Sequence, residues 1–436
     1  MLPQIRHLRC LLLFALLTHS ALAAIPEWVR QAASPPTPTY SPETKAVVLL
    51  DDTGYTVTGA GEFQEHYRRV VRILRPDGRE QADLHVHLQQ HEKLVSIHAW
   101  TLDTSGREYE LKEKDFAEAG AFADFILYSD DRMRTAVAPA AQPGSVIAFE
   151  YEVHRHAWLN QLNWSLHEDI PVREVRLTLS LPPRWEYKTL WAATPPIQPS
   201  QTGANRWEWV TRDLAAIEDE PMRPPLPALA GRMKLTYFVS GDQSGSNGSW
   251  ESLARWYLGL TANRRVATPE LTAATRNLIA GQTTFERKLR ALAAFLQSEV
   301  RYVAIEIGIG GHQPHAAAEV FRARYGDCKD KATLLATMLH EAGITANYVL
   351  IHTERGIVDP EAPSDSFNHA IVAVELPQGT SVGAYHSVVT AKSGKRYLLF
   401  DPTDQYTPVG ELRPDLQHSY ALLVTEAGGE LIQTPL

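Results

Sequence analysis

Cysteine is scarce in this sequence, which has only Cys10 and Cys328 among its 436 residues. Cys10 lies in an N-terminal segment that we expect to be cleaved, which would leave one thiol and no possible intramolecular disulfide. A lone thiol outside the cytoplasm meets oxidants. We therefore expect Cys328 to be either a small buried hydrophobic side chain or a nucleophile, and composition alone leaves both open.

The chain also has no excess of positive charge. It carries 51 acidic and 42 basic residues, a formal net charge of −9, so it has no general attraction for nucleic acid or anionic lipid. Its composition, 44% hydrophobic and 21% charged, is that of a globular protein. This excludes wholesale disorder, collagen-like repeats and a polytopic membrane protein, and we expect no nucleic-acid partner.

A single hydrophobic run, residues 11–17, lies near the N-terminus between Arg9 and Ala21-Leu22-Ala23. A basic start, a short apolar centre and small residues at the end predict a signal peptide over 1–23, cleaved near Ala23. The run is shorter than the roughly 20 residues that span a bilayer. We expect an exported, periplasmic protein with no transmembrane segment in the mature chain; a retained membrane-anchored helix is the alternative.

The rest of the chain divides into two parts of different character. Residues 24–45 hold five prolines and predict an extended linker rather than core. Residues 46–240 alternate turn sequences with short runs rich in Val, Ile, Thr and aromatic residues, which predicts an antiparallel β-sandwich-like domain. The Gly- and Ser-rich residues 241–249 predict a second linker.

Residues 250–436 predict an α+β domain, because helical patterns come first and strands later. Ser249 and Thr268 are expected to cap helices, and Thr283 with Glu286 has the spacing of a capping box before a 3.6-residue apolar period. Strands are predicted at 346–352, 369–376 and 397–400. The fold class is therefore α+β, with the β-rich domain first.

Cys328 is expected in the first turn of a helix that ends at Gly343. Unpaired N–H groups and the helix dipole favour an anion there, and Lys329 and Lys331 would add positive potential, so the thiolate would be favoured. The alternative is a cysteine that only fills space at a helix start. The expected buried stripe of this helix consists of Ala332, Leu335, Met338, Leu339 and Ala342.

A thiol nucleophile needs a base, and the base needs an orienting partner. His369 starts one predicted strand, and Asp401 ends the next, before a proline that halts strand pairing. Taken singly, such a histidine is more often structural and an aspartate before proline is usually part of a turn. The three residues together favour a Cys–His–Asp site, with Asp404 as an alternative orienter.

The residues around these positions resemble the transglutaminase-like superfamily, and more narrowly an exported bacterial branch in which a β-rich domain of unknown function precedes the core. The resemblance implies a papain-type fold with Cys328 as nucleophile, His369 as base and Asp401 as orienter. The animal cross-linking enzymes of the superfamily carry a tryptophan where Lys329 stands, and this difference argues against cross-linking and calcium dependence. The segments that carry the resemblance are Tyr325-Gly326-Asp327-Cys328-Lys329-Asp330, Asn368-His369-Ala370, Asp401-Pro402-Thr403 and residues 300–315.

The implied chemistry is acyl transfer from a protein or peptide amide to water or an amine, with no cofactor and no metal. The backbone N–H of Cys328 and the side chain of Gln313 are candidate oxyanion donors, although Gln313 could equally bond its own loop. His312, His315 and Cys328 could instead bind zinc. A non-catalytic binding or scaffold module and a cross-linking factor are the other functions considered; the sequence does not predict the oligomeric state.

Overall fold

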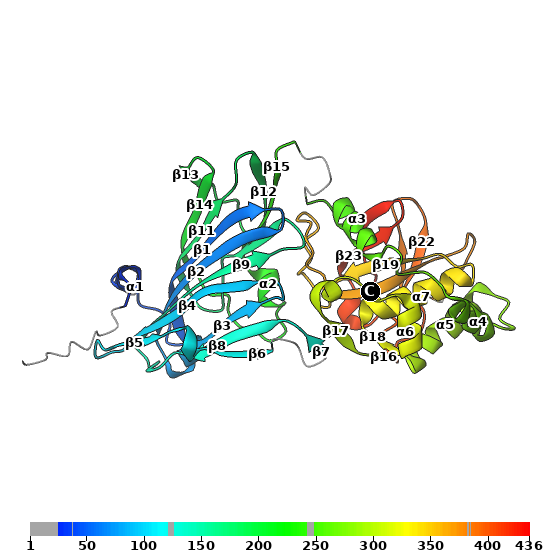
Figure 1. Cartoon of the computed structure of the whole chain (residues 1–436), viewed down its shortest axis with the longest axis horizontal. Coiled ribbons are helices and arrows are strands. Elements are labelled where there is room, and N and C mark those ends of the chain that lie inside the picture. Colours follow the sequence, from blue (N-terminus) through cyan, green and yellow to red (C-terminus); the bar gives the residue numbers. More distant parts are fainter. Residues whose placement is uncertain (1–24, 37, 121–125, 242–247, 382, 384) are drawn as a thin grey trace, which may run out of the picture.

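The computed structural model describes residues 25–36, 38–120, 126–241, 248–381, 383 and 385–436. It is a mixed α+β structure with 22% helix and 39% strand, and a β-rich domain precedes an α+β domain (Figure 1), as the sequence predicts. The expected signal peptide, residues 1–23, and Cys10 lie outside the described residues. Within the described ranges no helix is both long and apolar enough to cross a membrane.

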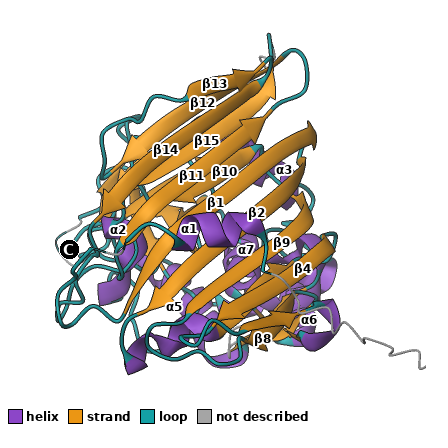
Figure 2. Ribbon diagram, turned by 90° about the vertical axis from the view of Figure 1, so that its left-hand side faces the viewer, coloured by secondary structure: helices purple, strands orange, loops and turns teal. Residues whose placement is uncertain are grey.

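The β-rich domain is built on one long twisted sheet of eight strands (Figure 2). β1 pairs in parallel with β11, and every other pair in this sheet is antiparallel. The parallel pair is not predicted by the sequence, because turn signals reveal hairpins but not which distant strands meet. The strands in sheet order are β13 (Ser200–Gly203), β14 (Arg206–Leu214), β11 (Val172–Ser180), β1 (Ala46–Gly59), β2 (Glu62–Ile73), β9 (Val146–His156), β4 (Lys93–Leu102) and β5 (Glu108–Leu111).

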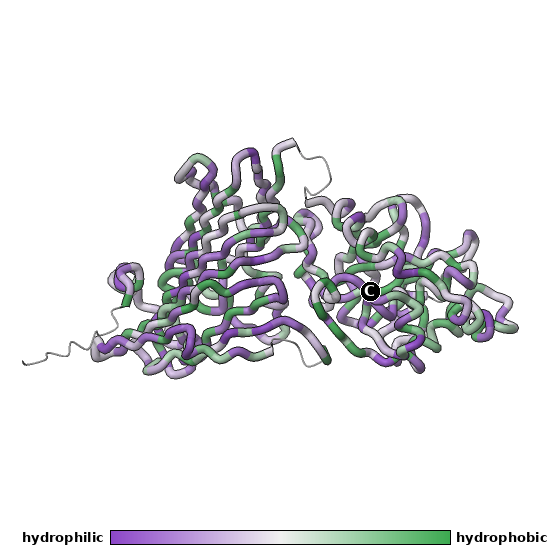
Figure 3. The backbone as a smooth tube through the Cα atoms, viewed as in Figure 1, coloured by the Kyte–Doolittle hydropathy of each residue, from purple (hydrophilic) through white to green (hydrophobic). Residues whose placement is uncertain are grey.

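Two three-stranded sheets cover one face of the long sheet and complete a sandwich. Each makes its own hydrophobic core with it, one around Trp209 and Tyr237 and the other around Ile97 and Phe149. Along the strands, apolar and polar residues alternate (Figure 3), as one-sided burial requires. The first sheet contains β10 (Gln161–Ser165), β15 (Arg232–Val239) and β12 (Trp185–Ala192), and the second contains β3 (Asp83–Leu88), β8 (Arg132–Val137) and β6 (Ala117–Gly120).

The expectation of an extended linker over 24–45 is wrong for its first part. Residues Glu27–Ala33 form helix α1. Ile25 and Val29 are buried against the other face of the long sheet, beside Val70 and Trp100. The prolines flank this helix rather than interrupt it, and the apolar face of the sheet supplies the contact that orders it.

The second domain packs helices on a six-stranded antiparallel sheet. Alternate residues of β20 contact the helices and a second apolar cluster on the other face, so both faces of the sheet are buried. The strands in order are β21 (Val388–Thr390), β22 (Arg396–Phe400), β20 (His369–Glu375), β19 (Ala346–Ile351), β23 (Tyr420–Thr425) and β24 (Gly428–Gln433). The helices are α3 (Trp250–Thr261), α4 (Pro269–Leu278), α5 (Phe285–Glu299), α6 (Ala317–Ala323) and α7 (Cys328–Glu341).

The helix starts follow the sequence signals closely. Ser249 and Thr268 cap α3 and α4 through their side chains. The cap of α5 is Thr284, which accepts from Arg287 N, so the expected capping box at Thr283 is wrong by one residue. A cap depends on which of two adjacent hydroxyls reaches the third N–H, which the spacing alone does not settle.

The two domains contact each other directly. Strand β7 (Ile126–Ser129) of the β-rich domain pairs in parallel with β17 (Ala304–Glu306) of the second domain. On β15, Lys234 Nζ donates to Ser364 Oγ and Ala362 O in the loop that leads to β20. The exact domain boundaries expected from the sequence (46–240, 241–249 and 250–436) stay a prediction, and most of the expected 241–249 linker lies outside the described residues.

Helix α7 is buried on every side, from Lys329 to Leu339. Replacing Leu335, which has no exposed surface, by alanine should lower the unfolding free energy by about 2–5 kcal/mol, because it leaves a cavity in the core. Chemical denaturation measures this. The matched helix variant Arg287→Ala, at an exposed position on α5, should change it by less than about 0.5 kcal/mol; equal effects of the two variants would contradict the packing of α7.

Candidate active site

Cys328 is the first residue of α7, as the sequence predicts. Asp327 caps the helix by accepting from Asp330 N (3.2 Å), and Asp330 Oδ2 accepts from Asp327 N (3.3 Å). A Cβ on Gly326 would lie 2.6 Å from Asp330 Cβ, so only glycine fits before this cap. The backbone N–H of Cys328 has no acceptor within the helix, because the first turn of a helix leaves its N–H groups free.

The two lysines after Cys328 are buried rather than exposed to solvent. Lys329 Nζ donates to Asp327. Burial opposes the charge of Lys329, but Asp327 and Cys328 raise its pKa above the ordinary value. Lys331 Nζ donates to Val300 O (2.8 Å), and burial lowers its pKa to about 8. Lys329 therefore adds positive potential beside the sulfur, whereas Lys331 holds the chain at Val300.

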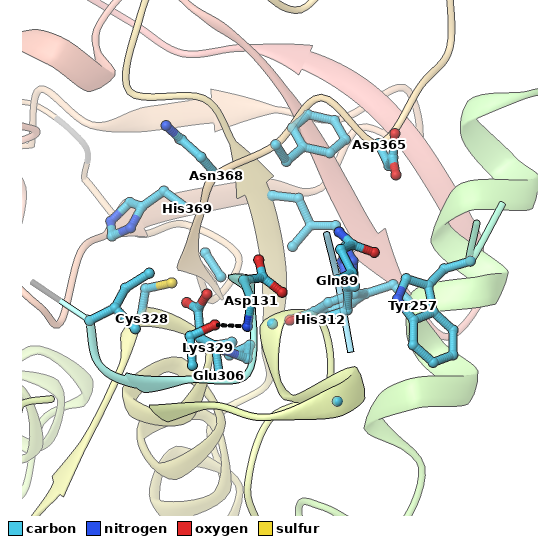
Figure 4. Close-up of a pocket in the computed structure, with 18 of the residues that line it drawn as sticks. Gln89, Asp131, Tyr257, Glu306, His312, Cys328, Lys329, Asp365, Asn368 and His369 are labelled. Atoms are coloured by element: carbon cyan, nitrogen blue, oxygen red, sulfur yellow. Dashed lines mark hydrogen bonds between the residues drawn. The ribbon is translucent and has the colours of Figure 1, made fainter. Parts of the chain in front are cut away.

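His369 begins β20 and forms a buried pair with Asp401 at the end of β22. His369 Nε2 lies 3.0 Å from Asp401 Oδ2. Burial disfavours the imidazolium, but the charge of Asp401 and hydrogen bonds with Asp401 and Cys328 raise the pKa of His369 to about 10. The structure thus brings together the three residues that the sequence singled out, and Figure 4 shows His369 beside Cys328.

Asp401 is fully buried and its geometry is fixed. Its Oδ1 accepts from Thr403 N (2.9 Å) and Thr403 Oγ1 (2.7 Å), and Arg413 Nε lies 3.7 Å from its Oδ2. Burial favours the neutral acid, but the charge of His369 and the hydrogen bonds from His369 and Thr403 lower the pKa of Asp401 to about 2. Asp401 is therefore a carboxylate at physiological pH.

The sulfur and the imidazole open into a cleft of about 340 Å³ between the two domains. The β-rich domain contributes one wall through the β3–β4 loop, strand β7 and Trp158, and the second domain contributes the other through α3 and the residues around His312. The ring of His312 packs edge to face against Trp158 and Trp256, with ring centres 6.5 and 5.4 Å apart. Access to the thiol is therefore shaped by both domains.

Carboxylates without a cationic partner line the cleft. Asp131 comes from the β-rich domain, whereas Glu306 and Asp365 come from the second domain, and among the described residues none of the three forms an ion pair. Burial and the charge of Asp130 raise the pKa of Asp131. Burial and the charges of Asp327 and Asp131 raise the pKa of Glu306, against the opposing charge of Lys329. The two domains thus place negative charges near each other at the thiol.

Two tyrosines near the sulfur escaped the sequence analysis. Tyr302 lines the cleft, and burial and the charge of Cys328 raise its pKa. Tyr257 lies on α3, across the cleft from Cys328 in Figure 4. Tyr257 belongs to the apolar stripe of its helix, so its pattern is that of a core residue. No sequence signal separates it from its buried neighbours.

The structure does not support Gln313 as an oxyanion donor. Its Oε1 accepts from Arg264 Nη2 (2.6 Å), its Nε2 donates to Leu260 O (2.9 Å), and it is not among the residues that line the cleft. Asp404 is likewise committed elsewhere, because its carboxylate accepts from Tyr406 N and Thr407 Oγ1. Both side chains stabilise loops.

The zinc alternative finds no support in the part of the chain that the structure describes, where no group of three or more His, Cys, Asp or Glu residues could hold a metal. His315 instead lies against the helix cap, with Nδ1 3.1 Å from Asp330 Oδ2 and its backbone N–H donating to Asp330 Oδ1. His312 therefore packs against tryptophan rings, whereas His315 contacts Asp330.

Both domains of the chain match known protein families. Residues 272–402 match the transglutaminase-like superfamily, and residues 59–218 match a domain of unknown function, DUF3857. The second domain is therefore a domain of the transglutaminase-like superfamily, and a DUF3857 domain precedes it. The predicted family is confirmed. No protein of curated function matches the chain in sequence.

One solved structure shares the fold of both domains. A "putative protease" from Parabacteroides distasonis ATCC 8503 superimposes with a TM-score of 0.62 at 15% identity, over 84% of this chain and 71% of that chain. A "putative cysteine protease" from Cytophaga hutchinsonii aligns over 86% of this chain and 87% of that chain at 10% identity, with a TM-score of 0.24. The first likeness extends over both domains and shows a common fold.

The charge of Asp401 should control the protonation of His369. In Asp401→Asn the pKa of His369 should fall from about 10 to its ordinary value of about 6.5 or below, because burial is then unopposed. NMR titration of the imidazole measures this. A raised pKa contributes stability that is complete below about pH 6.5 and is lost as the pH rises through about 10. The unfolding free energy of the native protein should therefore fall across that range, and less so in the variant.

Asp404→Asn is the matched control, since it removes the neighbouring carboxylate, which does not contact His369. It should leave the titration of His369 unchanged. A shift in Asp404→Asn as large as that in Asp401→Asn would make Asp404 the orienting residue.

Proposed function

We propose that this protein is an exported thiol enzyme that transfers the acyl group of a protein or peptide amide to water or an amine. Cys328 is the nucleophile, His369 the general acid and base, and Asp401 the group that orients and charges His369. The observation that carries the proposal is the buried His369–Asp401 pair, which holds an imidazolium beside the only cysteine among the described residues.

The reaction follows from the groups around the sulfur. The nucleophile is the thiolate of Cys328, whose proton is held by His369; the sulfur electron pair forms a bond to the amide carbon while the carbonyl π pair moves onto oxygen. When the C=O bond reforms, the C–N bond breaks, and His369 gives its proton to the leaving nitrogen. Water or an amine then attacks the thioester with His369 as base, and the C–S bond breaks to regenerate the thiolate.

Burial supports this assignment over a scaffold role. Placing an ion pair such as His369–Asp401 in the protein interior costs desolvation free energy, which a purely structural core could avoid with apolar residues. Cys328 is only partly buried and lines an open cleft, which a space-filling cysteine has no need to do. Perturbed titratable groups that converge on a cleft are typical of an active site.

In the native protein Cys328 should react as a thiolate at pH values too low for an ordinary thiol to ionise. At pH 6 iodoacetamide should alkylate Cys328 at least about tenfold faster than free cysteine, because a free thiol with a pKa near 8.5 is then less than about 1% ionised. His369→Ala should reduce the rate to that of a free thiol or below. Labelling followed by peptide mass spectrometry measures both.

His386→Ala is the control, because it removes an exposed histidine of the same domain that pairs with Glu411. It should leave the labelling rate unchanged. Labelling of the native protein no faster than that of free cysteine would sink the proposal of a charged thiol–imidazole pair and favour a binding or scaffold module.

Amine incorporation separates the two acceptors of the acyl group. A fluorescent primary amine would become attached to a glutamine-bearing protein such as casein if amines resolve the thioester. Release of ammonia or of a new peptide end, without attached amine, would identify a hydrolase. Cys328→Ser should abolish either product.

A further inference from the structure

The cleft at Cys328 has an excess of carboxylates that the mechanism above does not use. Among the described residues that line it, four are Asp or Glu, whereas Lys329 is the one Lys or Arg. The ammonium of Lys329 already donates to Asp327. The carboxylates of Asp131 and Glu306 have no hydrogen bond or ion pair in the part of the chain that the structure describes. They are therefore free to receive a positive group from outside.

Main-chain contacts hold Glu306 at the thiol. The segment before Glu306 runs beside the segment that leads into Cys328, since Val303 N donates to Gly326 O (3.1 Å). Glu306 itself pairs with Ser129 of β7 in the parallel ladder between the domains. Its place in the cleft is thus set by backbone pairing on strand β17 and not by a mobile side-chain contact.

Asp131 is brought to the same place from the β-rich domain. It follows β7 directly, and its backbone N–H donates to Ser129 Oγ (3.1 Å). The residue before it, Asp130, accepts from Gly308 N across the domain junction (2.9 Å). This turn places Asp131 next to the strand of Glu306, and both carboxylates line the cleft with the thiol (Figure 4).

The two carboxylates oppose the thiol chemistry unless a cation joins them. A negative charge near a thiol disfavours the thiolate, and two like charges from different domains also repel each other. A bound cation would remove both costs. Independently of these charges, Cys328 and His369 already indicate that a substrate enters this cleft. The substrate is therefore the natural source of the cation.

We propose that Asp131 and Glu306 bind a basic side chain of the acyl donor, so that the protein acts on amides near a lysine or arginine residue. The assignment rests on the proposed thiol chemistry. The cation belongs to the donor rather than to an attacking amine, because carboxylates stabilise the protonated amine, which has no lone pair for attack. The basic side chain keeps its proton and takes no part in the bond changes.

Charged thiol reagents measure the potential at Cys328 without any acyl transfer. On the full-length protein at low salt, the rate with cationic 2-aminoethyl methanethiosulfonate is divided by the rate with anionic 2-sulfonatoethyl methanethiosulfonate. Both attack the same sulfur, so a change in its reactivity cancels in this ratio. The ratio should exceed that of free cysteine at least about tenfold. The double variant Asp131→Asn/Glu306→Gln should lose this excess, and each single variant should lose part of it.

Esters test the assignment to the acyl donor. The Nα-blocked 4-nitrophenyl esters of lysine and norleucine differ by one ammonium group, and their bursts of nitrophenolate report acylation of Cys328. The lysine ester should react at least about tenfold faster, and the double variant Asp131→Asn/Glu306→Gln should lose this preference. Glu299→Gln/Glu361→Gln is the matched control, since it removes two exposed carboxylates that do not line the cleft. It should leave both ratios as in the native protein.

Three outcomes would overturn the assignment. A reagent ratio no higher than that of free cysteine, or one that the double variant keeps, would show that the two carboxylates do not act at the thiol. Equal bursts with the lysine and norleucine esters would show that the cation does not belong to the donor. Rapid reaction with the methanethiosulfonates but no burst with either ester would remove the proposed acyl transfer, and the donor assignment with it, while leaving the measured potential intact.

Discussion

The burial of α7 on all sides is the constraint on which the rest of the second domain depends. The helix is enclosed by other helices and by the sheet, and of its residues Cys328 and Lys329, the first two, line the cleft. The cap between Asp327 and Asp330 fixes where the helix begins, and Gly326 permits the close approach of the preceding chain. A shift of the helix by one residue would turn Cys328 by about 100° and away from His369. Rigid packing far from the cleft thus sets the geometry at the sulfur.

Most of what positions the site was predictable from the sequence because it depends on local signals. A cap, an apolar stripe and a terminal glycine define α7, and apolar runs define the two strands that carry His369 and Asp401. The prediction that Gln313 is an oxyanion donor was wrong because its partners are distant in sequence. Arg264 and Leu260 lie about fifty residues earlier, and no local pattern reveals that pairing. Tyr257 was missed for the same reason, because a core position and a cleft position on an apolar helix face have the same period. Helix α1 was missed because its order comes from the sheet that it covers.

The electrostatics of the cleft arise from burial combined with charges of opposite sign. Asp401 alone would be a costly buried charge, and so would an imidazolium alone; together, with Thr403 completing the hydrogen bonds, each stabilises the charged form of the other. Lys329 is bound to Asp327, and its charge lies next to the sulfur. The carboxylates of Asp131 and Glu306 line the same cleft and form no ion pair among the described residues, although the charge of Lys329 opposes the rise in the pKa of Glu306.

The β-rich domain is part of the cleft and not merely attached to it. The β7–β17 pair joins backbone to backbone, and Lys234 ties β15 to the loop that leads into His369. The hydrogen bonds of Lys234 to serine hydroxyls and a carbonyl depend on the distance between the domains. Burial lowers the pKa of Lys234 to about 8. These hydrogen bonds link the position of the β-rich domain to that of the loop before β20. The domain of unknown function forms one wall of the cleft, so its surface, together with that of the second domain, shapes the approach to Cys328.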